Sequence, residues 1–212
     1  MVNDAKEAVK KGFKILKIKV GVDPSKDFQR VKMIRENIEN DIKIRLDANQ
    51  GWNIKETLSL MKKLEKYDIE LLEQPVLNWN IEGLKYLRNY LSLPIVADES
   101  VFSVHDALNI IRLDAADMIN IKLMKCGGIY NAIKINKIAE AAGIECMIGC
   151  MVESKISVTA AAHFAAAFKN ITKADLDSPL FFESDFIPDG IAYDLGMIHM
   201  SSTPGLGISE TI

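Results

Sequence analysis

The chain has 212 residues, of which 49% are hydrophobic and 26% charged, and 26 Lys and Arg against 29 Asp and Glu give a formal charge of −3. This profile is typical of a globular protein, and without clustered basic residues it excludes nucleic acid and membrane surfaces as expected partners. The sequence contains neither an apolar run of about 18 residues nor a basic-then-apolar leader, so we expect no membrane span and no signal peptide.

A helix over residues 3–12 is predicted first, ending at Gly12. Short β-branched runs then predict strands at residues 15–20, 42–46, 69–72, 94–97, 118–123, 145–148 and, with a weaker pattern, 174–177. Between them, apolar residues at three- and four-residue spacing predict helices at 27–38, 54–67, 81–91, 104–112, 130–142 and 154–168. This alternation predicts an α/β fold with parallel strands joined by crossover helices.

An ionisable residue follows or ends each of the first five predicted strands. The intervals between successive members are 28, 26, 25 and 24 residues, for Lys19, Asp47, Glu73, Asp98 and Lys122. Such a chain could form an open doubly wound sheet or a closed barrel. The even spacing favours a TIM-like barrel. Barrel enzymes place their chemistry at the carboxyl ends of the strands, where these five residues stand.

Three of these residues are acids on consecutive strands. Because neighbouring strands lie about 4.8 Å apart, the carboxylates of Asp47, Glu73 and Asp98 are expected to converge within a few ångströms. A hard divalent cation would relieve their repulsion, and three oxygen ligands with open octahedral positions suit Mg²⁺. The alternative is that each acid only caps the helix that follows it.

The lysines are expected to face the same space. Lys17 and Lys19 are two residues apart and share one face of their strand, while Ile18 and Val20 point toward the helices. Lys122 lies four strands further along, which is diametrically opposite in an eight-stranded barrel. The alternative places one or more of these amines at the solvent-exposed rim.

This arrangement implies a reaction. A cation bound to a carboxylate substrate stabilises the enediolate that forms when the α-proton leaves. A lysine beside a cation and another ammonium has a lowered pKa and can act as a base near neutral pH. With one amine on each face, one would remove the proton and the other would return it, which inverts the stereocentre.

At this point the motifs resemble those of the enolase superfamily, in its muconate-lactonizing subgroup. The segments that carry the resemblance are Lys17-Ile18-Lys19, residues 46–51, Glu73-Gln74-Pro75, residues 97–100 and residues 120–123. The resemblance implies that Asp47, Glu73 and Asp98 bind Mg²⁺ and that Lys19 and Lys122 form the acid/base pair. Lys17 would then be an electrostatic neighbour of the substrate carboxylate.

Within that subgroup the sequence is most similar to dipeptide epimerases of the L-Ala-D/L-Glu type, through residues 119–128 and 175–180. The resemblance assigns Asp175 and Asp177 to the α-ammonium group of a dipeptide, which two acids on one strand face suit by charge-assisted hydrogen bonds. Taken alone, these residues favour a turn. The other candidates are a cycloisomerase, an o-succinylbenzoate synthase, an N-acylamino acid racemase, or a non-catalytic barrel remnant.

The resemblance also implies an N-terminal capping domain and a first strand that this sequence lacks. We therefore expect a (β/α)7β barrel without its first strand and cap over residues 1–185, and a tail over 186–212 packed on the barrel or the cap. An unclosed seam would expose strand edges, so a homo-oligomer is one expectation. The cysteines, Cys126, Cys146 and Cys150, lack metal-ligand spacing and are interpreted as reduced thiols of a cytoplasmic protein.

Overall fold

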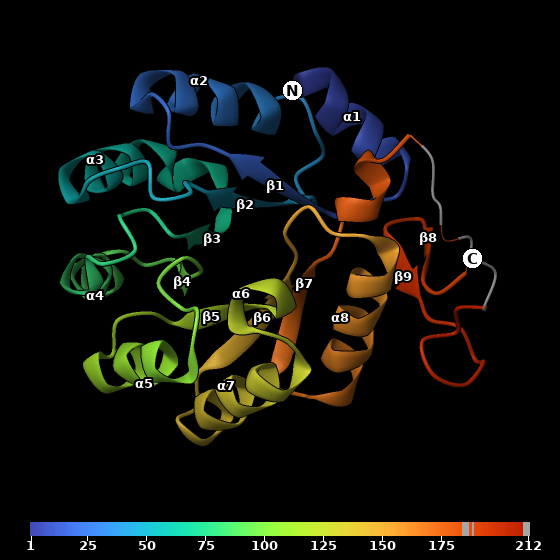
Figure 1. Cartoon of the computed structure of the whole chain (residues 1–212). Coiled ribbons are helices and arrows are strands. Elements are labelled where there is room, and N and C mark those ends of the chain that lie inside the picture. The colour runs from blue at the N-terminus through green and yellow to red at the C-terminus, as the bar shows by residue number, and fades with distance from the viewer. Residues whose placement is uncertain (184–186, 188, 210–212) are drawn as a thin grey trace.

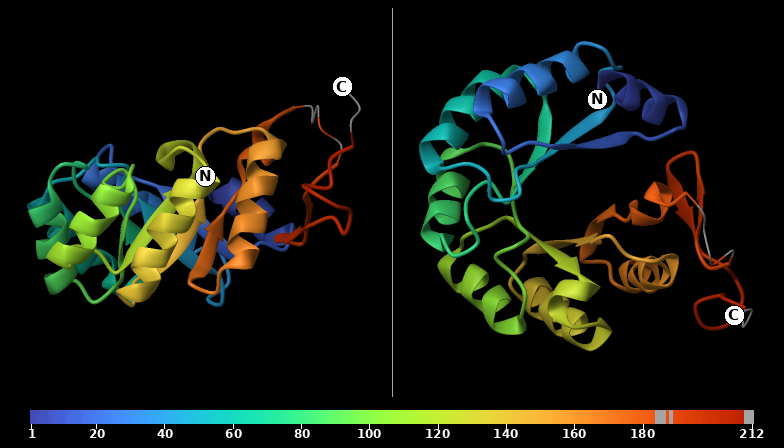
Figure 2. Two further views of the ribbon diagram at one scale, coloured as in Figure 1. Left: turned by 60° about the horizontal axis from the view of Figure 1, so that its bottom comes forward. Right: turned by 45° about the horizontal axis from the view of Figure 1, so that its top comes forward.

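The computed structural model describes residues 1–183, 187 and 189–209. Within these residues, seven parallel strands follow one another in sequence order and curl around a common axis, with the helices on the outside (Figures 1 and 2). The strands are β1 (Ile15–Lys19), β2 (Lys43–Asp47), β3 (Ile69–Glu73), β4 (Ile95–Ala97), β5 (Met118–Lys122), β6 (Glu145–Gly149) and β7 (Ile171–Asp175). The predicted α/β barrel class is confirmed.

The helices cover the outer face of the sheet. They are α1 (Val2–Lys10), α2 (Pro24–Arg35), α3 (Ile54–Leu64), α4 (Ile81–Tyr90), α5 (Val104–Leu113), α6 (Leu123–Cys126), α7 (Ile129–Ala141) and α8 (Lys155–Ala167), with short 3-10 turns η1 (Glu65–Tyr67) and η2 (Ser178–Phe181). Among the described residues, no helix is both long and apolar enough to cross a membrane.

Local capping sets where these helices begin. The side chain of Asp23 accepts hydrogen bonds from the backbone N–H groups of Ser25 and Lys26, and Pro24 stands at the first helical position. Helix α2 therefore starts three residues before the predicted residue 27. The short helix α6, directly after β5, was not predicted, because a single turn has too few residues to show a helical period.

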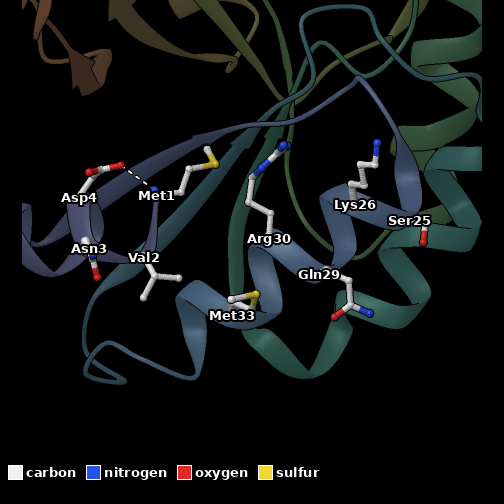
Figure 3. Close-up of a pocket in the computed structure, with 9 residues that line it drawn as sticks. All are labelled: Met1, Val2, Asn3, Asp4, Ser25, Lys26, Gln29, Arg30 and Met33. Carbon is white, nitrogen blue, oxygen red and sulfur yellow. Dashed lines mark ion pairs between the residues drawn. The ribbon is translucent and has the colours of Figure 1, made fainter.

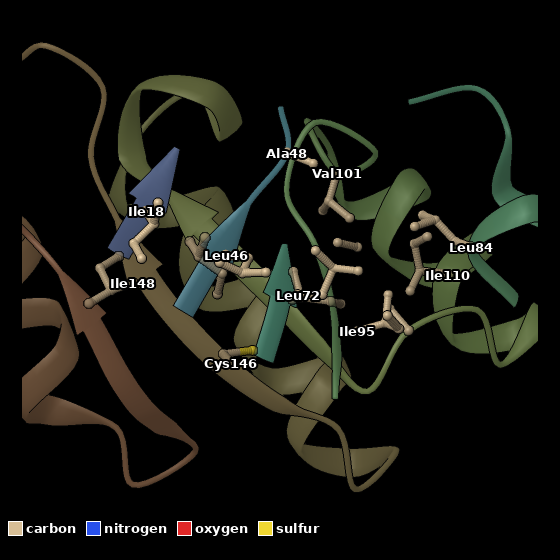
Figure 4. Close-up of a cluster of buried hydrophobic side chains, with 14 of the residues drawn as sticks. Ile18, Leu46, Ala48, Leu72, Leu84, Ile95, Val101, Ile110, Cys146 and Ile148 are labelled. Atoms are coloured by element: carbon tan, nitrogen blue, oxygen red, sulfur yellow. The ribbon is translucent and has the colours of Figure 1, made fainter. Parts of the chain in front are cut away.

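The alternation along each strand divides the core into two layers. Ile18, Leu46 and Leu72 belong to the outer layer, which packs between the sheet and the helices (Figure 4). The residues that alternate with them along each strand face the barrel axis. Toward the amino ends of the strands this inner face is closed by a small buried cluster of Leu71, Val96, Met118 and Met147. The polar residues of the same face are therefore grouped at the carboxyl ends.

The last strand differs from its prediction. It spans Ile171–Asp175 rather than residues 174–177, so Asp175 ends the strand and Asp177 lies beyond it. Asp177 has helical backbone angles at the start of η2, where Pro179 follows. The pattern of Asp-Leu-Asp-Ser-Pro thus combines the end of a strand with a turn.

Strands β1 and β7 are the two edges of the sheet. Two side chains of the inner face reach from the first strands to β7: Lys17 forms an ion pair with Asp175, and Arg45 donates to the carbonyl oxygen of Ala174 at 3.4 Å. These links cross the region between the edges, where the barrel is not closed by backbone pairing.

The tail was expected to be irregular, but it contains an antiparallel pair, β8 (Ala192–Asp194) and β9 (Met197–His199). The turn of this hairpin lies against the end of α1, because a Cβ added to Gly12 would fall 2.7 Å from the Cα of Leu195. Ile191 is buried and donates its N–H to Thr159 of α8. The tail packs on the barrel at both contacts, while the predicted boundary at residues 185 and 186 lies outside the described residues.

Candidate active site

Three buried carboxylates meet at the carboxyl ends of adjacent strands. Asp47 and Glu73 are the last residues of β2 and β3 and stand opposite each other in the strand register, and Asp98 follows β4 directly. One oxygen from each of the three lies within 4.8 Å of the others, and their side chains are buried. The predicted convergence is present, although Asp98 stands two residues beyond Val96, the register partner of Glu73.

The three acids differ in their electrostatic surroundings. Burial, with the neighbouring carboxylates of Asp47 and Asp98, raises the pKa of Glu73 to about 7 despite the amine of Lys17. Burial also acts to raise the pKa of Asp98, but the amines of Lys125 and Lys122 outweigh it and lower that pKa to about 2. The cluster therefore contains one carboxyl group that holds a proton easily and one that is firmly ionised.

Lys122 is the last residue of β5 and points into the barrel. Its side chain is 7% exposed, and its Nζ lies 2.6 Å from Oδ2 of Asp98. Burial acts to lower the pKa of this amine, but the carboxylates of Asp98 and Glu73 raise it overall. The charge is thus neutralised by a specific partner, which is the condition for a buried ammonium.

Lys17 and Lys19 lie on one face of β1, as predicted, but their surroundings differ. Lys17 is partly buried; burial acts to lower its pKa, but the carboxylates of Glu73, Asp175 and Asp47 raise it overall. The Lys19 side chain is 57% exposed and lies at the mouth of the barrel. Its Nζ still reaches Oδ2 of the buried Asp47 at 2.6 Å.

The loops after β1 and β2 pack backbone against backbone. Gly21 has a φ of +102°, and a Cβ added there would fall 2.1 Å from the carbonyl oxygen of Ala48. The buried carboxylate of Asp27 accepts from the N–H of Gly21 at 2.8 Å and from the indole N–H of Trp52 at 3.2 Å. This acid ties together the loops that carry Lys19 and Asp47.

The two acids proposed for the substrate ammonium lie at the β7 end of the site. Asp175 forms the ion pair with Lys17, and its backbone carbonyl accepts from the thiol of Cys150 at 3.4 Å. Burial and the charge of Asp175 raise the pKa of Asp177. The structure places both acids next to each other, with Asp175 already engaged by an amine.

Three residues at the site were missed by the sequence reasoning. Lys125 is 4% exposed and its Nζ lies 2.5 Å from Oδ1 of Asp98. Asn120 donates to Oε1 of Glu73 at 2.6 Å, and the buried Gln74 accepts from the N–H of Asp98 and donates to Ser100. Strand parity could have found Asn120, which is two residues before Lys122. Lys125 depends on helix α6, which the sequence did not predict.

One cavity lies away from these charges. It is a groove of about 590 Å³ between α1 and α2, lined by residues such as Met1, Gln29 and Met33 (Figure 3). None of the acids or lysines of the site lines it. A smaller cavity of about 320 Å³ borders Trp79 and Glu99 in the loops after β3 and β4. The chemistry is therefore located by the cluster of charges and not by the size of a cavity.

The three acids fit a magnesium ion in donor type and spacing. They are buried hard oxygen ligands within reach of one position, and they lie among amines that offset their charge. Asp47, Glu73 and Asp98 would hold the ion, and the backbone N–H of Asn49, which donates to Oδ1 of Asp47 at 3.0 Å, fixes one ligand in place.

Comparison with known proteins identifies the family of the chain. A model of the enolase C-terminal domain-like family matches residues 1–210. The chain belongs to this family. Membership confirms the resemblance drawn from the strand-end motifs, and it agrees with the curled parallel sheet described above.

Among curated members, the chain is 50% identical to the L-Ala-D/L-Glu epimerase of Clostridium acetobutylicum over 98% of its length and 59% of the relative's. It is 51% identical to the hydrophobic dipeptide epimerase of Enterococcus faecalis over 99% of its length and 60% of the relative's. The chain thus spans about 60% of the length of these relatives.

Solved structures give the same neighbours. A substrate-liganded complex of the L-Ala-D/L-Glu epimerase from Bacillus subtilis superposes with a TM-score of 0.96 at 48% identity, covering 98% of this chain and 58% of that one. The Enterococcus faecalis dipeptide epimerase complexed with Mg and L-Leu-L-Tyr gives a TM-score of 0.95 at 50% identity, covering 99% of this chain and 60% of that one.

Proposed function

We propose that this chain carries the catalytic residues of a Mg²⁺-dependent dipeptide epimerase of the L-Ala-D/L-Glu type. One observation carries the proposal: amines on β1 and β5 flank three buried acids on the strands between them. Two relatives are dipeptide epimerases, and one of their structures contains Mg and a dipeptide. Both facts support the same reaction.

Each residue has a role that its position supports. Lys19 on one wall and Lys122 on the other would remove and return the α-proton on opposite faces of the substrate. Lys17, held among Asp47, Glu73 and Asp175, would attract the substrate carboxylate. Mg²⁺, when bound by the three acids, would stabilise the negative charge that develops on the substrate as the proton leaves.

A dipeptide is favoured over the substrates of related enzymes by its free ammonium group. Asp175 and Asp177 place two carboxyl groups at the β7 end of the site, and a protonated amine is their natural partner. Substrates of a cycloisomerase, an o-succinylbenzoate synthase or an N-acylamino acid racemase lack such a group. Neutralising the acids by Asp175→Asn and Asp177→Asn should therefore weaken binding of dipeptides and leave N-acylated amino acids unaffected.

The direct test is α-proton exchange. The chain, with Mg²⁺ and L-Ala-L-Glu or a small dipeptide library in D₂O, should incorporate deuterium at the α-carbon, followed by NMR. Lys19→Ala and Lys122→Ala together should abolish the exchange, and removing the metal should do the same. Exchange that survives either change would contradict the proposal. If the chain alone is silent, adding a capping domain from a relative separates an incomplete enzyme from a non-catalytic barrel.

We further propose that the protein acts in the cytoplasm and that the unpaired edges of β1 and β7 favour a homo-oligomer. The free thiols of Cys126, Cys146 and Cys150 support a reducing compartment. Light scattering coupled to size exclusion would test the association, with a monomer at all concentrations as the contrary result.

A further inference from the structure

A chain of two hydrogen bonds joins three loops at the mouth of the barrel. Nζ of Lys19 donates to Oδ1 of Asn49 at 2.8 Å, and Nδ2 of Asn49 donates to Oε1 of Glu99 at 2.9 Å. The three residues end or follow β1, β2 and β4. Asn49 has a φ of +40°, a conformation that asparagine tolerates better than most residues. Its side chain therefore bridges an exposed amine and a partly buried acid.

The acid determines which way the amide points. An ionised carboxylate accepts hydrogen bonds and donates none, so the NH₂ group of Asn49 must face Glu99. The carbonyl oxygen of the same amide is then left facing Lys19, where an ammonium needs an acceptor. The ammonium of Lys19 selects the same orientation, because it only donates, so a neutral group at position 99 would weaken the hold on the amide without reversing it.

Stability does not account for the position of Glu99. Its Oε2 is buried without a hydrogen-bond partner among the described residues, which is an unfavourable state for a carboxylate oxygen. Its other oxygen accepts from the amide of Asn49. Both Lys19 and Lys122 are paired with an acid at 2.6 Å, and Lys19 has the Asn49 contact in addition.

We propose that Glu99 is a positioning residue for Lys19 and acts by fixing the orientation of the Asn49 side chain. The inference deepens the proposed function, on which it rests for the role of Lys19. It makes a one-sided prediction, because Glu99 influences one of the two amines. Loss of Glu99 should impair proton transfer on the Lys19 face of the substrate and leave the Lys122 face largely intact.

The test compares the two epimers of one dipeptide. In D₂O with Mg²⁺, Lys19→Ala and Lys122→Ala first assign which epimer loses α-proton exchange when each amine is removed. Glu99→Gln should then slow exchange of the Lys19-dependent epimer about three- to tenfold, the effect of replacing a charge-assisted hydrogen bond by a neutral one, with the other epimer changed less than about twofold. Equal slowing of both epimers would overturn the proposal, as would no slowing of either.

A double-mutant cycle sharpens the result. Asn49→Gly keeps a residue that accepts positive φ and removes the amide, so it should reproduce the one-sided loss. The double variant with Glu99→Gln should be no slower than Asn49→Gly alone, because both changes break the same chain. Additive losses of exchange rate would contradict the proposal that Glu99 acts through Asn49. Glu82→Gln, at an exposed site in the first turn of α4, is the matched control for loss of one negative charge.

A second measurement needs no turnover. The Lys19 side chain is 57% exposed, so its amine can be acetylated with an activated ester and followed by mass spectrometry. Glu99→Gln should raise the labelling rate of Lys19 about threefold relative to the exposed Lys62, while Glu82→Gln leaves the ratio unchanged. An unchanged ratio overturns the inference. Should the lysine variants have no effect on exchange, the proposed function fails while this labelling still decides the role of Glu99.

Discussion

The two walls of the site hold their amines in different ways. Lys122 belongs to β5, which has a strand on each side. Its side chain is 7% exposed and forms an ion pair with Asp98. Lys19 belongs to the edge strand β1, is 57% exposed, and is held by Asp47 and by the side chain of Asn49. Both amines are therefore held by an ion pair at 2.6 Å, and the exposed Lys19 has a loop contact in addition.

The largest effect is expected on proton transfer. Lys122→Ala and Lys19→Ala should each reduce epimerisation by about 10²- to 10⁴-fold, because each removes one acid/base group. Each variant should still exchange the α-proton of one epimer, and the two should differ in which one. Deuterium incorporation measured separately for each epimer checks this. Loss of exchange for both epimers in both variants would contradict the proposal that each amine serves one face of the substrate.

Stability should separate the walls next. Asp98→Asn leaves Lys122 and Lys125 buried without their acid and should lower the free energy of unfolding by about 3–5 kcal/mol. Lys19→Ala should change it by less than about 1 kcal/mol, since the Lys19 amine is solvent-accessible and the buried Asp47 keeps its ion pair with Lys17 at 3.3 Å. Urea denaturation of the two variants gives both values. Similar losses would mean that the Lys19 wall is not the looser one.

The pH dependence of metal binding depends on the acid between the walls. The pKa of Glu73 is raised from 4.5 to about 7 by burial, so the folded protein keeps a proton there that the unfolded chain loses. Without metal, this group makes the fold less stable as pH rises from about 4.5 to about 7. Mg²⁺ binding must displace the proton, so affinity should rise with pH and level off above about 7. Calorimetric titration in buffers of different ionisation heat measures the released proton, and a flat affinity would contradict the assignment.

The smallest effect concerns the loops of the Lys19 wall. Trp52→Phe removes the indole donor from Asp27 and leaves a small cavity in place of the five-membered ring, and should lower the free energy of unfolding by about 1–3 kcal/mol. Because Asp27 also holds the N–H of Gly21, the loop after β1 should become more mobile. Amide hydrogen exchange at Gly21 reports this. Unchanged exchange at Gly21 would mean that Asp27 does not hold the loop that follows Lys19.

Much of the fold and of the site could be predicted because both depend on strand ends. Periodicity gave the first six strands to within one or two residues, and the carboxyl ends of consecutive parallel strands brought Asp47, Glu73 and Asp98 together. The seventh strand was misplaced because its residues alternate weakly and a turn follows at once. The tail hairpin was missed because its strands of three residues are too short to show a period.

The sequence by itself determined which residues share the inner face and the carboxyl ends, since side-chain alternation is a local property of a strand. The tertiary structure decided how deeply each amine is buried, because the surrounding strands and loops cover Lys17 and Lys122 and leave Lys19 at the mouth. It also placed Lys125 on Asp98 and Glu99 on Asn49, contacts between residues 27 and 50 positions apart. Such contacts arise only when the loops after different strands meet at the barrel mouth.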